Sequence, residues 1–143
     1  MKATPLKDLN RLISENRVDD YPSPNRALGM KPVRFARGTS EWEWGEQPAV
    51  ARNPFGTVQG GYLAVFVDEL FSTAIGSILE DGEWAVTAET KLSYLRAAQP
   101  GMLRGSAHIL RRTRSLAFAQ AEVKDAADAI VAAASSTWSI SRA

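Results

Sequence analysis

Two kinds of residue with chemical potential lie in the stretch NPFGTVQGGYLAVFVDELFSTAIGSIL, residues 53–79. Gly60 and Gly61 precede an apolar run, and Asp68 and Glu69 form an adjacent acid pair inside it. Glycine amides at a helix start lack partners and lie at the positive end of the dipole, so they suit a carbonyl oxygen that gains negative charge. A carboxylate can act as a general base or as a nucleophile. The stretch therefore combines residue types suited to attack on a carbonyl group.

The acid pair belongs to a run that we expect to form a helix surrounded by protein. Its apolar residues are too many for one stripe: Leu63, Phe66, Val67, Leu70, Ala74, Ile75, Ile78 and Leu79. A lone buried carboxylate costs on the order of several kcal/mol unless it is paired, hydrogen-bonded or protonated. Two explanations stay open: an acid bonds a neighbouring element or reaches solvent at this turn, or an acid serves a reaction.

Other elements must position this helix. An amphipathic helix near the amino terminus shares one face among Leu6, Leu9, Leu12 and Ile13. Residues 16–31 form a turn-rich connector, after which half-buried strands are indicated by Val33, Phe35, Trp42 and Trp44.

Four strand patterns follow the apolar helix. In residues 84–96, one face carries Trp84, Val86, Ala88, Leu92 and Tyr94, and the other carries Thr87, Glu89, Lys91 and Ser93. Residues 102–112 and 115–123 predict two more strands. Residues 129–140 predict the last, with Ile130, Trp138 and Ile140 on one face, although 126–134 also has strong helix propensity.

One apolar helix followed by four strands predicts an α+β fold in which an antiparallel sheet wraps around a central helix. We expect an N-terminal helix and connector over residues 1–30 and one domain over residues 31–143. No internal repeat divides the chain further.

Composition limits the function. The 143 residues contain no cysteine, which removes thiolate catalysis and thiolate metal sites, and the single histidine makes a zinc site improbable. A formal net charge of +1 gives no overall field for nucleic acid or anionic lipid. The chain shows no signal-peptide core and no apolar stretch long enough for a membrane span, so we expect a cytoplasmic protein.

The stretch NPFGTVQGGYLAVFVDELFSTA resembles the signature of hotdog-fold acyl-CoA thioesterases of the PaaI-like, phenylacetate-degradation type. That signature is an asparagine, a short spacer, His-Gly-Gly and then an acid on the helix. Asn53 matches the asparagine and would hold the loop, and Gly60 and Gly61 match the glycine pair. Asp68 matches the helix acid, and Thr87 matches the Ser or Thr on the next strand, where it would position a water molecule.

The resemblance covers about residues 30–140 and implies an acyl-CoA substrate and a homodimer with shared active sites, as a dimer of dimers. It favours Asp68 over Glu69 as base or nucleophile, with the Gly60 amide as oxyanion donor. Gln59 stands where the family most often has histidine. Its amide can donate a hydrogen bond to the thioester oxygen but cannot exchange a proton near neutral pH. We predict no cofactor.

A distance argument supports the shared site. Gly60 and Asp68 are eight residues apart, or about 12 Å along a helix, whereas an oxyanion donor and a base must both lie near one carbonyl carbon. Two helices from a twofold dimer can meet this requirement.

The remaining candidates are weaker. His108 is expected on a strand, and no G-x-S-x-G motif accompanies it, which disfavours a Ser-His-Asp hydrolase. A magnesium site made only of carboxylates stays open, although we predict no metal. Arg111, Arg112 and Arg114 form the densest basic cluster and are either a solvated strand end or partners for coenzyme A phosphates.

The sequence thus favours a thioester hydrolase that forms a homo-oligomer. Two alternatives remain: a noncatalytic acyl-CoA binding protein, favoured by Gln59, and a hotdog dehydratase or hydratase. The acyl group is not defined, because the aromatic residues near the motif can either line a pocket or fill the core.

Overall fold

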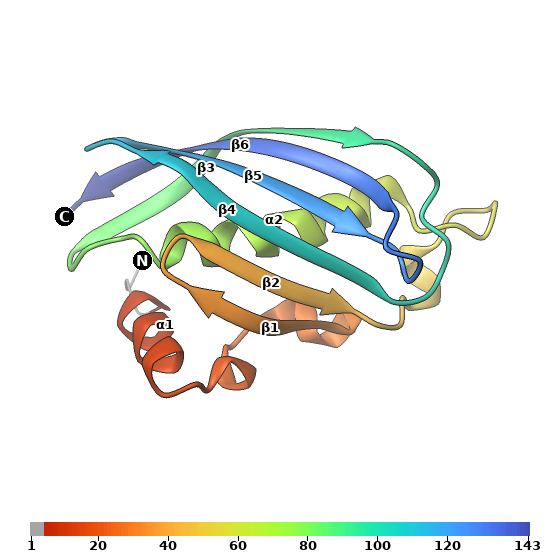
Figure 1. The fold of residues 1–143 in the computed structure, drawn as a ribbon, viewed down its shortest axis with the longest axis horizontal. Coiled ribbons are helices and arrows are strands. Elements are labelled where there is room, and N and C mark those ends of the chain that lie inside the picture. The colour runs from red at the N-terminus through yellow and green to blue at the C-terminus, as the bar shows by residue number, and fades with distance from the viewer. Residues whose placement is uncertain (1–4) are drawn as a thin grey trace.

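The computed structural model describes residues 5–143, which form one curved antiparallel sheet around a long helix (Figure 1). The strands are β1 (Met30–Ala36), β2 (Thr39–Trp44), β3 (Glu83–Tyr94), β4 (Leu103–Arg112), β5 (Leu116–Lys124) and β6 (Ile130–Arg142). Their order across the sheet is β1-β2-β4-β5-β6-β3. The helices are α1 (Pro5–Ser14) and α2 (Gly60–Gly76), with short 3₁₀ turns at Val18–Asp20, Pro24–Leu28 and Ala49–Ala51. The predicted α+β architecture is confirmed.

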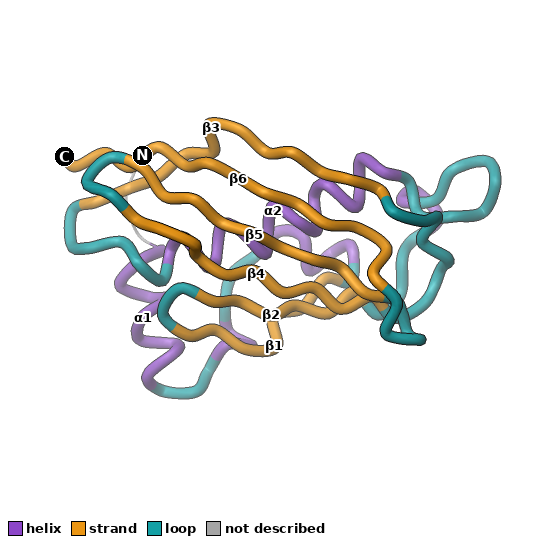
Figure 2. Tube along the Cα trace, turned by 45° about the horizontal axis from the view of Figure 1, so that its top comes forward, coloured by secondary structure: helices purple, strands orange, loops and turns teal. Residues whose placement is uncertain are grey.

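The helix α2 lies against the inner face of the sheet, which curves around it (Figure 2). Close approach depends on Gly105 of β4, because a Cβ atom there would lie 2.6 Å from Leu70 Cδ1 and 3.0 Å from Phe66 Cε1. A buried hydrogen bond also joins the helix to the sheet: the Trp42 indole N–H of β2 donates to Thr73 Oγ1 of α2 at 3.0 Å. The position of α2 over β2, β4 and β5 is therefore set by both shape and hydrogen bonding.

The helix α1 packs on the far end of α2. Leu9 and Leu12 are buried, and a Cβ atom on Gly76 would lie 3.0 Å from Leu9 Cδ2. The predicted apolar face is present at these positions, whereas the side chain of Leu6 lies outside the described part of the structure. Our boundary at residue 30 stays a prediction. No helix within residues 5–143 is long and apolar enough to cross a membrane.

Strand β3 differs from the simple alternation that we expected. A bulge between Thr87 and Glu89 shifts its register against β6, so the two halves of the strand present opposite parities to the core. Trp84 and Val86 consequently face outward, 40% and 44% exposed, whereas Leu92 lies on the inner face. The prediction that Trp84, Val86 and Leu92 share one face is wrong. The residue inserted at the bulge reverses which alternate residues of β3 face the core.

The same effect explains two smaller errors. A register shift between Pro32 and Arg34 in β1 leaves Val33 45% exposed, although Phe35 is buried as expected. In β6, a shift against β5 turns Ile130 outward, 37% exposed, away from the face of Trp138. The last element is a strand, as we predicted, and it begins only after a tight turn.

Candidate active site

One face of α2 is open to solvent in the single chain. Gly61, Ala64 and Asp68 recur at the spacing of one helical face, and all three are exposed. The expectation that protein surrounds this helix on all sides is therefore wrong for the single chain. The carboxylate of Asp68 does not lie in an apolar core.

Asp68 meets Thr87 at this open face. The Thr87 hydroxyl lies close enough to the Asp68 carboxylate to favour its charged form as a donor and so to lower its pKa. Thr87 is paired with the inward-facing Trp138 in the β3–β6 register, immediately before the bulge. The bulge thus lets β3 direct Thr87 toward α2 while keeping Leu92 on the same inner face. The structure brings these two predicted site residues together within one chain.

The pKa of the Asp68 carboxyl lies above its ordinary value. Loss of hydration is the largest cause, because the surrounding protein displaces part of the water that would stabilise the charge even though the side chain reaches solvent. The negative charge of Glu69 raises the pKa further, while the hydrogen bond from Thr87 lowers it. A carboxylate tuned in this direction is a stronger base than a freely solvated one.

Glu69 has a different environment, at only 7% exposure. Its Oε1 atom accepts hydrogen bonds from Ser23 Oγ at 2.6 Å and from Asn25 Nδ2. Both donors belong to the connector before β1, so Glu69 joins that segment to α2. Burial, and secondly the charge of Glu69, raise the pKa of nearby Tyr21. Of the two explanations for the acid pair, hydrogen bonding to a neighbouring element thus applies to Glu69.

The start of α2 carries two free amides. Gln59 is the N-cap residue: its backbone N–H donates to the Ala51 carbonyl at 2.8 Å, and its exposed side chain does not cap the helix. Within residues 5–143, no acceptor is bonded to the amides of Gly60 or Gly61. Two donors are therefore left at the positive end of the α2 dipole.

Asn53 organises the loop that precedes this helix start. Its Nδ2 atom donates to Thr57 Oγ1 at 2.7 Å, and its Oδ1 atom accepts from the backbone amides of Phe55 at 3.0 Å and Thr57 at 3.2 Å. The loop is thereby fixed internally, while Phe55 at its tip is 92% exposed. In this chain Asn53 contacts its own loop and not Asp68.

The two halves of the predicted chemistry are not brought together in the single chain. Gly60 and Asp68 lie on the same helix, α2, eight positions apart, which corresponds to about 12 Å along its axis. The Gly60 amide and the Asp68 carboxylate of one chain are therefore too far apart to contact the same substrate carbonyl group.

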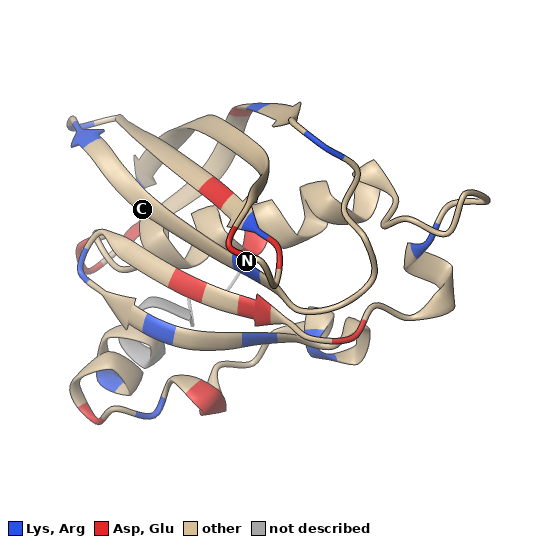
Figure 3. Cartoon of the chain, turned by 45° about the vertical axis from the view of Figure 1, so that its right-hand side comes forward, with Lys and Arg blue, Asp and Glu red and all other residues tan. Residues whose placement is uncertain are grey.

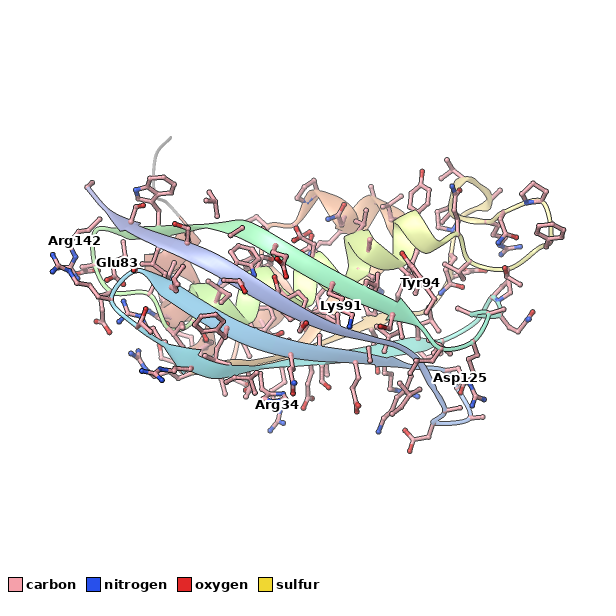
Figure 4. All side chains as sticks on the ribbon, turned by 90° about the horizontal axis from the view of Figure 1, so that it is seen from above. Arg34, Glu83, Lys91, Tyr94, Asp125 and Arg142 are labelled. Atoms are coloured by element: carbon pink, nitrogen blue, oxygen red, sulfur yellow. The ribbon has the colours of Figure 1, made fainter. Side chains whose placement is uncertain are left out.

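The arginine cluster lies at the other end of the sheet. Arg112 forms an ion pair with Glu83, which is 5% exposed, and Arg142 Nη2 approaches the same carboxylate at 3.3 Å. Burial alone raises the pKa of Glu83, but the bonds from the Glu80 backbone amide and the two arginines outweigh it and lower the pKa. Figure 4 shows Glu83 and Arg142 at the end opposite Tyr94. Arg112 is thus held by a structural ion pair, whereas Arg111 and Arg114 are exposed.

His108 lies on the outer face of β4, the face turned away from α2. It lines an open depression of about 480 Å³ together with Lys91, Gln120 and Ser135. Basic and acidic residues are interspersed along the chain instead of gathering in one basic region (Figure 3). Arg34 of β1, for example, pairs with Glu41 of β2 at 2.6 Å. Among the described side chains, no three His, Asp or Glu residues gather in a way that could hold a metal ion.

Sequence reasoning missed one contact at the helix start. Tyr94, the last residue of β3, donates a hydrogen bond from Oη to the Gly60 carbonyl at 2.8 Å. No local signal announces a bond between residues 34 positions apart, and the parity pattern only marked Tyr94 as apolar. To find this hydrogen bond, one would have needed the β3–β6 register and the position of the first residue of α2.

Comparisons with known proteins give the family and the fold of the chain. A family model for the Thioesterase superfamily matches residues 55–132. A phenylacetic acid degradation-related protein from Ralstonia eutropha is similar in structure, with 29% identity, a TM-score of 0.78 and coverage of 92% of this chain and 98% of that one. No curated protein gives a significant sequence match.

More distant structures share the fold. The PaaI protein of the phenylacetic acid degradation operon of E. coli is 19% identical, with a TM-score of 0.79 and 96% of each chain covered. Thioesterase HI1161 from Haemophilus influenzae is 21% identical, with a TM-score of 0.78 and coverage of 99% of this chain and 93% of that one. The hotdog fold implied by the sequence resemblance is confirmed. Since the family match spans more than half of the 143 residues, the chain belongs to the thioesterase superfamily.

Proposed function

We propose that the protein hydrolyses acyl-CoA thioesters to the free acid and coenzyme A, in active sites shared by two copies of the chain. The observation that carries this proposal is the exposed carboxylate of Asp68 on the open face of α2, beside Thr87 of β3. A base placed there inside a thioesterase fold fits attack on a thioester carbonyl.

In the proposed reaction, Asp68 accepts a proton from a water molecule as the water oxygen attacks the thioester carbon. Thr87 holds the carboxylate through its hydrogen bond and positions the water. The tetrahedral intermediate then collapses, the carbon–sulfur bond breaks, and coenzyme A leaves as a thiolate that takes up a proton. Direct attack by Asp68 would instead expel the coenzyme A thiolate and form an anhydride that water opens. In a single turnover in ¹⁸O-water, only this route can place ¹⁸O in the Asp68 carboxylate, when water attacks the Asp68 carbonyl; the base route places it in the acid product.

The oxyanion is stabilised by the amides of Gly60 and Gly61 from the second chain. Gly61 supports this arrangement, because a Cβ atom there would meet nothing within 4 Å in its own chain and its φ lies outside the left-handed region. No contact or strain within the single chain therefore explains a glycine at position 61. Close approach of a substrate or of a second chain's backbone would explain it.

Strand β3 offers the surface for the second copy. It is the edge strand of the sheet next to β6, and most of its residues are exposed. An edge of this length, with Trp84 and Val86 partly exposed, favours pairing with another chain. Pairing of two β3 edges about a twofold axis would bring the Gly60 loop of one copy toward the Asp68 of the other.

Four further residues have proposed roles in substrate binding. The Gln59 amide donates to the thioester oxygen, and Asn53 keeps the Gly60 loop in its conformation. Arg111 and Arg114 bind coenzyme A phosphates, because both are exposed at the sheet end. Arg112 is not assigned a direct contact with the phosphates, because its guanidinium forms an ion pair with Glu83.

A panel of acyl-CoA substrates with detection of free thiol tests the proposal. Release of thiol that depends on Asp68 supports it. Saturable binding of acyl-CoA without thiol release across aromatic and aliphatic acyl groups would identify a noncatalytic binding protein instead. Hydration of an enoyl-CoA that is lost in His108→Ala would favour a hydratase, which the outer-face position of His108 opposes.

A further inference from the structure

Tyr94 links the edge strand to the start of α2. It is the last residue of β3, and its Oη atom donates to the Gly60 carbonyl at 2.8 Å. Figure 4 shows Tyr94 at the end of the sheet where α2 begins. The side chain is 53% exposed, so burial of apolar surface does not account for its placement.

The ring of Tyr94 also lies directly on Gly60. A Cβ atom built on Gly60 would be 3.0 Å from Tyr94 Cζ, 3.1 Å from Cε1 and 3.2 Å from Oη. Gly60 does not have the left-handed φ that would require glycine. A side chain at position 60 would therefore press on the Tyr94 ring, whereas the backbone conformation itself does not call for glycine.

We propose that Tyr94 is a positioning residue that fixes the orientation of the Gly60 and Gly61 amides relative to β3. The Gly60 carbonyl and the Gly61 N–H are the two ends of one peptide group, so a hydrogen bond to the carbonyl fixes the plane of the amide as well. The same bond polarises the peptide and strengthens the Gly61 N–H as a donor.

Contact with the ring has a second effect. Because the Tyr94 ring fills the space that a Cβ atom on Gly60 would occupy, it restrains the peptide groups on either side of Gly60, including the Gly60 N–H. Preorganised donors stabilise a developing oxyanion because they need no rearrangement during the reaction. Tyr94 thus acts through the glycines and has no required contact with the reacting atoms.

The kinetic test, which rests on the proposed function, uses Tyr94→Phe. This substitution keeps the ring on Gly60 and removes the hydroxyl donor. We expect kcat to fall about tenfold, less than the loss of a whole oxyanion donor, while KM stays within about twofold and the melting temperature changes little. Tyr21→Phe, which removes a phenol hydroxyl from the connector, should leave kcat unchanged. An unchanged kcat in Tyr94→Phe, with an active wild-type protein, would overturn the inference and leave the proposed function intact.

A second test needs no activity. In NMR spectra, Tyr94→Phe should shift the Gly60 carbonyl carbon and the Gly61 amide nitrogen, while the resonances of Gly76 at the other end of α2 stay in place. If the protein hydrolyses no acyl-CoA, the proposed function fails, but these shifts still decide whether Tyr94 orients the peptide. Unshifted resonances at Gly60 and Gly61 would reject the inference.

The ring contact is tested by paired substitutions. Gly60→Ala should lower the melting temperature in the wild-type background, because its Cβ meets the Tyr94 ring. In a Tyr94→Ala background the same substitution should cost much less. Gly61→Ala serves as the stability control, since its Cβ enters open space. Equal costs for Gly60→Ala in both backgrounds would show that the Tyr94 ring does not restrain Gly60. If Tyr94→Ala does not fold, the resonance shifts in Tyr94→Phe decide the question.

Discussion

Asp68 and Glu69 are neighbours in sequence, but they belong to two different regions of the molecule. Adjacent residues of a helix point about 100° apart, so one acid faces β3 and the other faces the connector. Asp68 is exposed and lies near the Thr87 hydroxyl, whereas Glu69 is buried and receives hydrogen bonds from Ser23 and Asn25. The helix therefore uses one carboxylate for structure and leaves the other open.

The difference in exposure separates a structural carboxylate, Glu69, from one that is accessible to a ligand, Asp68. The buried carboxylate has its donors supplied by the fold, which offsets the cost of removing it from water. The exposed one has an incomplete set of donors and a raised pKa, which leaves it able to accept a proton. The charge of Glu69 is one cause of that raised pKa, so the two regions are coupled.

The largest expected effect is that of Asp68→Asn. It should reduce kcat/KM by about 10³-fold while preserving acyl-CoA binding, since the amide keeps the shape and removes the base. Because the Asp68 pKa is raised in the folded state, its contribution to stability is lost as the pH rises through that pKa. The melting temperature of Asp68→Asn at pH 7 should thus equal or slightly exceed that of the wild type. A much smaller kinetic effect than that of Glu69→Gln would reverse the assignment of the two acids.

Glu69→Gln should lower stability more than activity, the reverse of Asp68→Asn. The hydrogen bonds from Ser23 and Asn25 lose their charge assistance, so the free energy of unfolding should fall by roughly 1 kcal/mol in denaturant titrations. The value of kcat/KM at neutral pH should stay within about threefold of the wild type. Asn25→Ala is the matched control, because it removes one donor to the same carboxylate and should also destabilise without loss of activity. Wild-type stability in both variants would refute the structural role of Glu69.

The coupling between the regions should appear in the pH profile. Activity needs ionised Asp68, so kcat/KM should rise with pH along an acid limb above the ordinary aspartate pKa of about 3.9. Glu69→Gln should move this limb to lower pH, because it removes a charge that raises the pKa. Thr87→Val should move the remaining activity to higher pH, because it removes a bond that lowers the pKa. Limbs that move together in the same direction would contradict the causes assigned to the shift.

The smallest expected effect is that of His108→Ala. This residue lies on the outer face of the sheet, away from Asp68, so kcat/KM should remain unchanged and no limb near pH 6.5 should appear or vanish. Gln59→His should likewise remain active. A histidine limb lost in His108→Ala would show that the outer face takes part in the reaction.

Much of the fold was predictable because the apolar pattern is dense and regular. The central helix, the strands after it and the family motif all followed from residues 53–140. The face of particular strand residues was not predictable where one inserted residue changed the parity, as with Trp84, Val86 and Val33. Such bulges leave no clear sequence signal, yet the bulge in β3 precedes the inner-facing Leu92 and accompanies the contact of Thr87 with Asp68.

The candidate site was predictable only in part. Motif spacing predicted Asp68 and Thr87 as site residues, and the structure places them near each other, but the spacing gave no sign that Glu69 bonds the connector. Contacts between residues far apart in sequence depend on the tertiary fold, as the bond from Tyr94 to Gly60 also shows. Short-range patterns therefore suggest candidate groups, but they do not reveal which distant residues contact those groups.

The most direct test of the central claim is rescue between two inactive chains. One chain carries Asn53→Ala with Gln59→Ala, which disables the loop beside Gly60, and the other carries Asp68→Asn. In a twofold dimer, each mixed pair contains one site with both lesions and one site with neither. Random pairing makes about half of the dimers mixed, which predicts recovery of roughly a quarter of wild-type thioesterase activity.

Differently tagged chains, coexpressed and purified through both tags, isolate the mixed dimers for this measurement. The shared site predicts about half of wild-type activity per mixed dimer, because one of its two sites is intact. Activity no higher than that of the two parent variants, in dimers shown to contain both chains, would contradict the shared site and with it the role of Asp68 opposite the Gly60 loop.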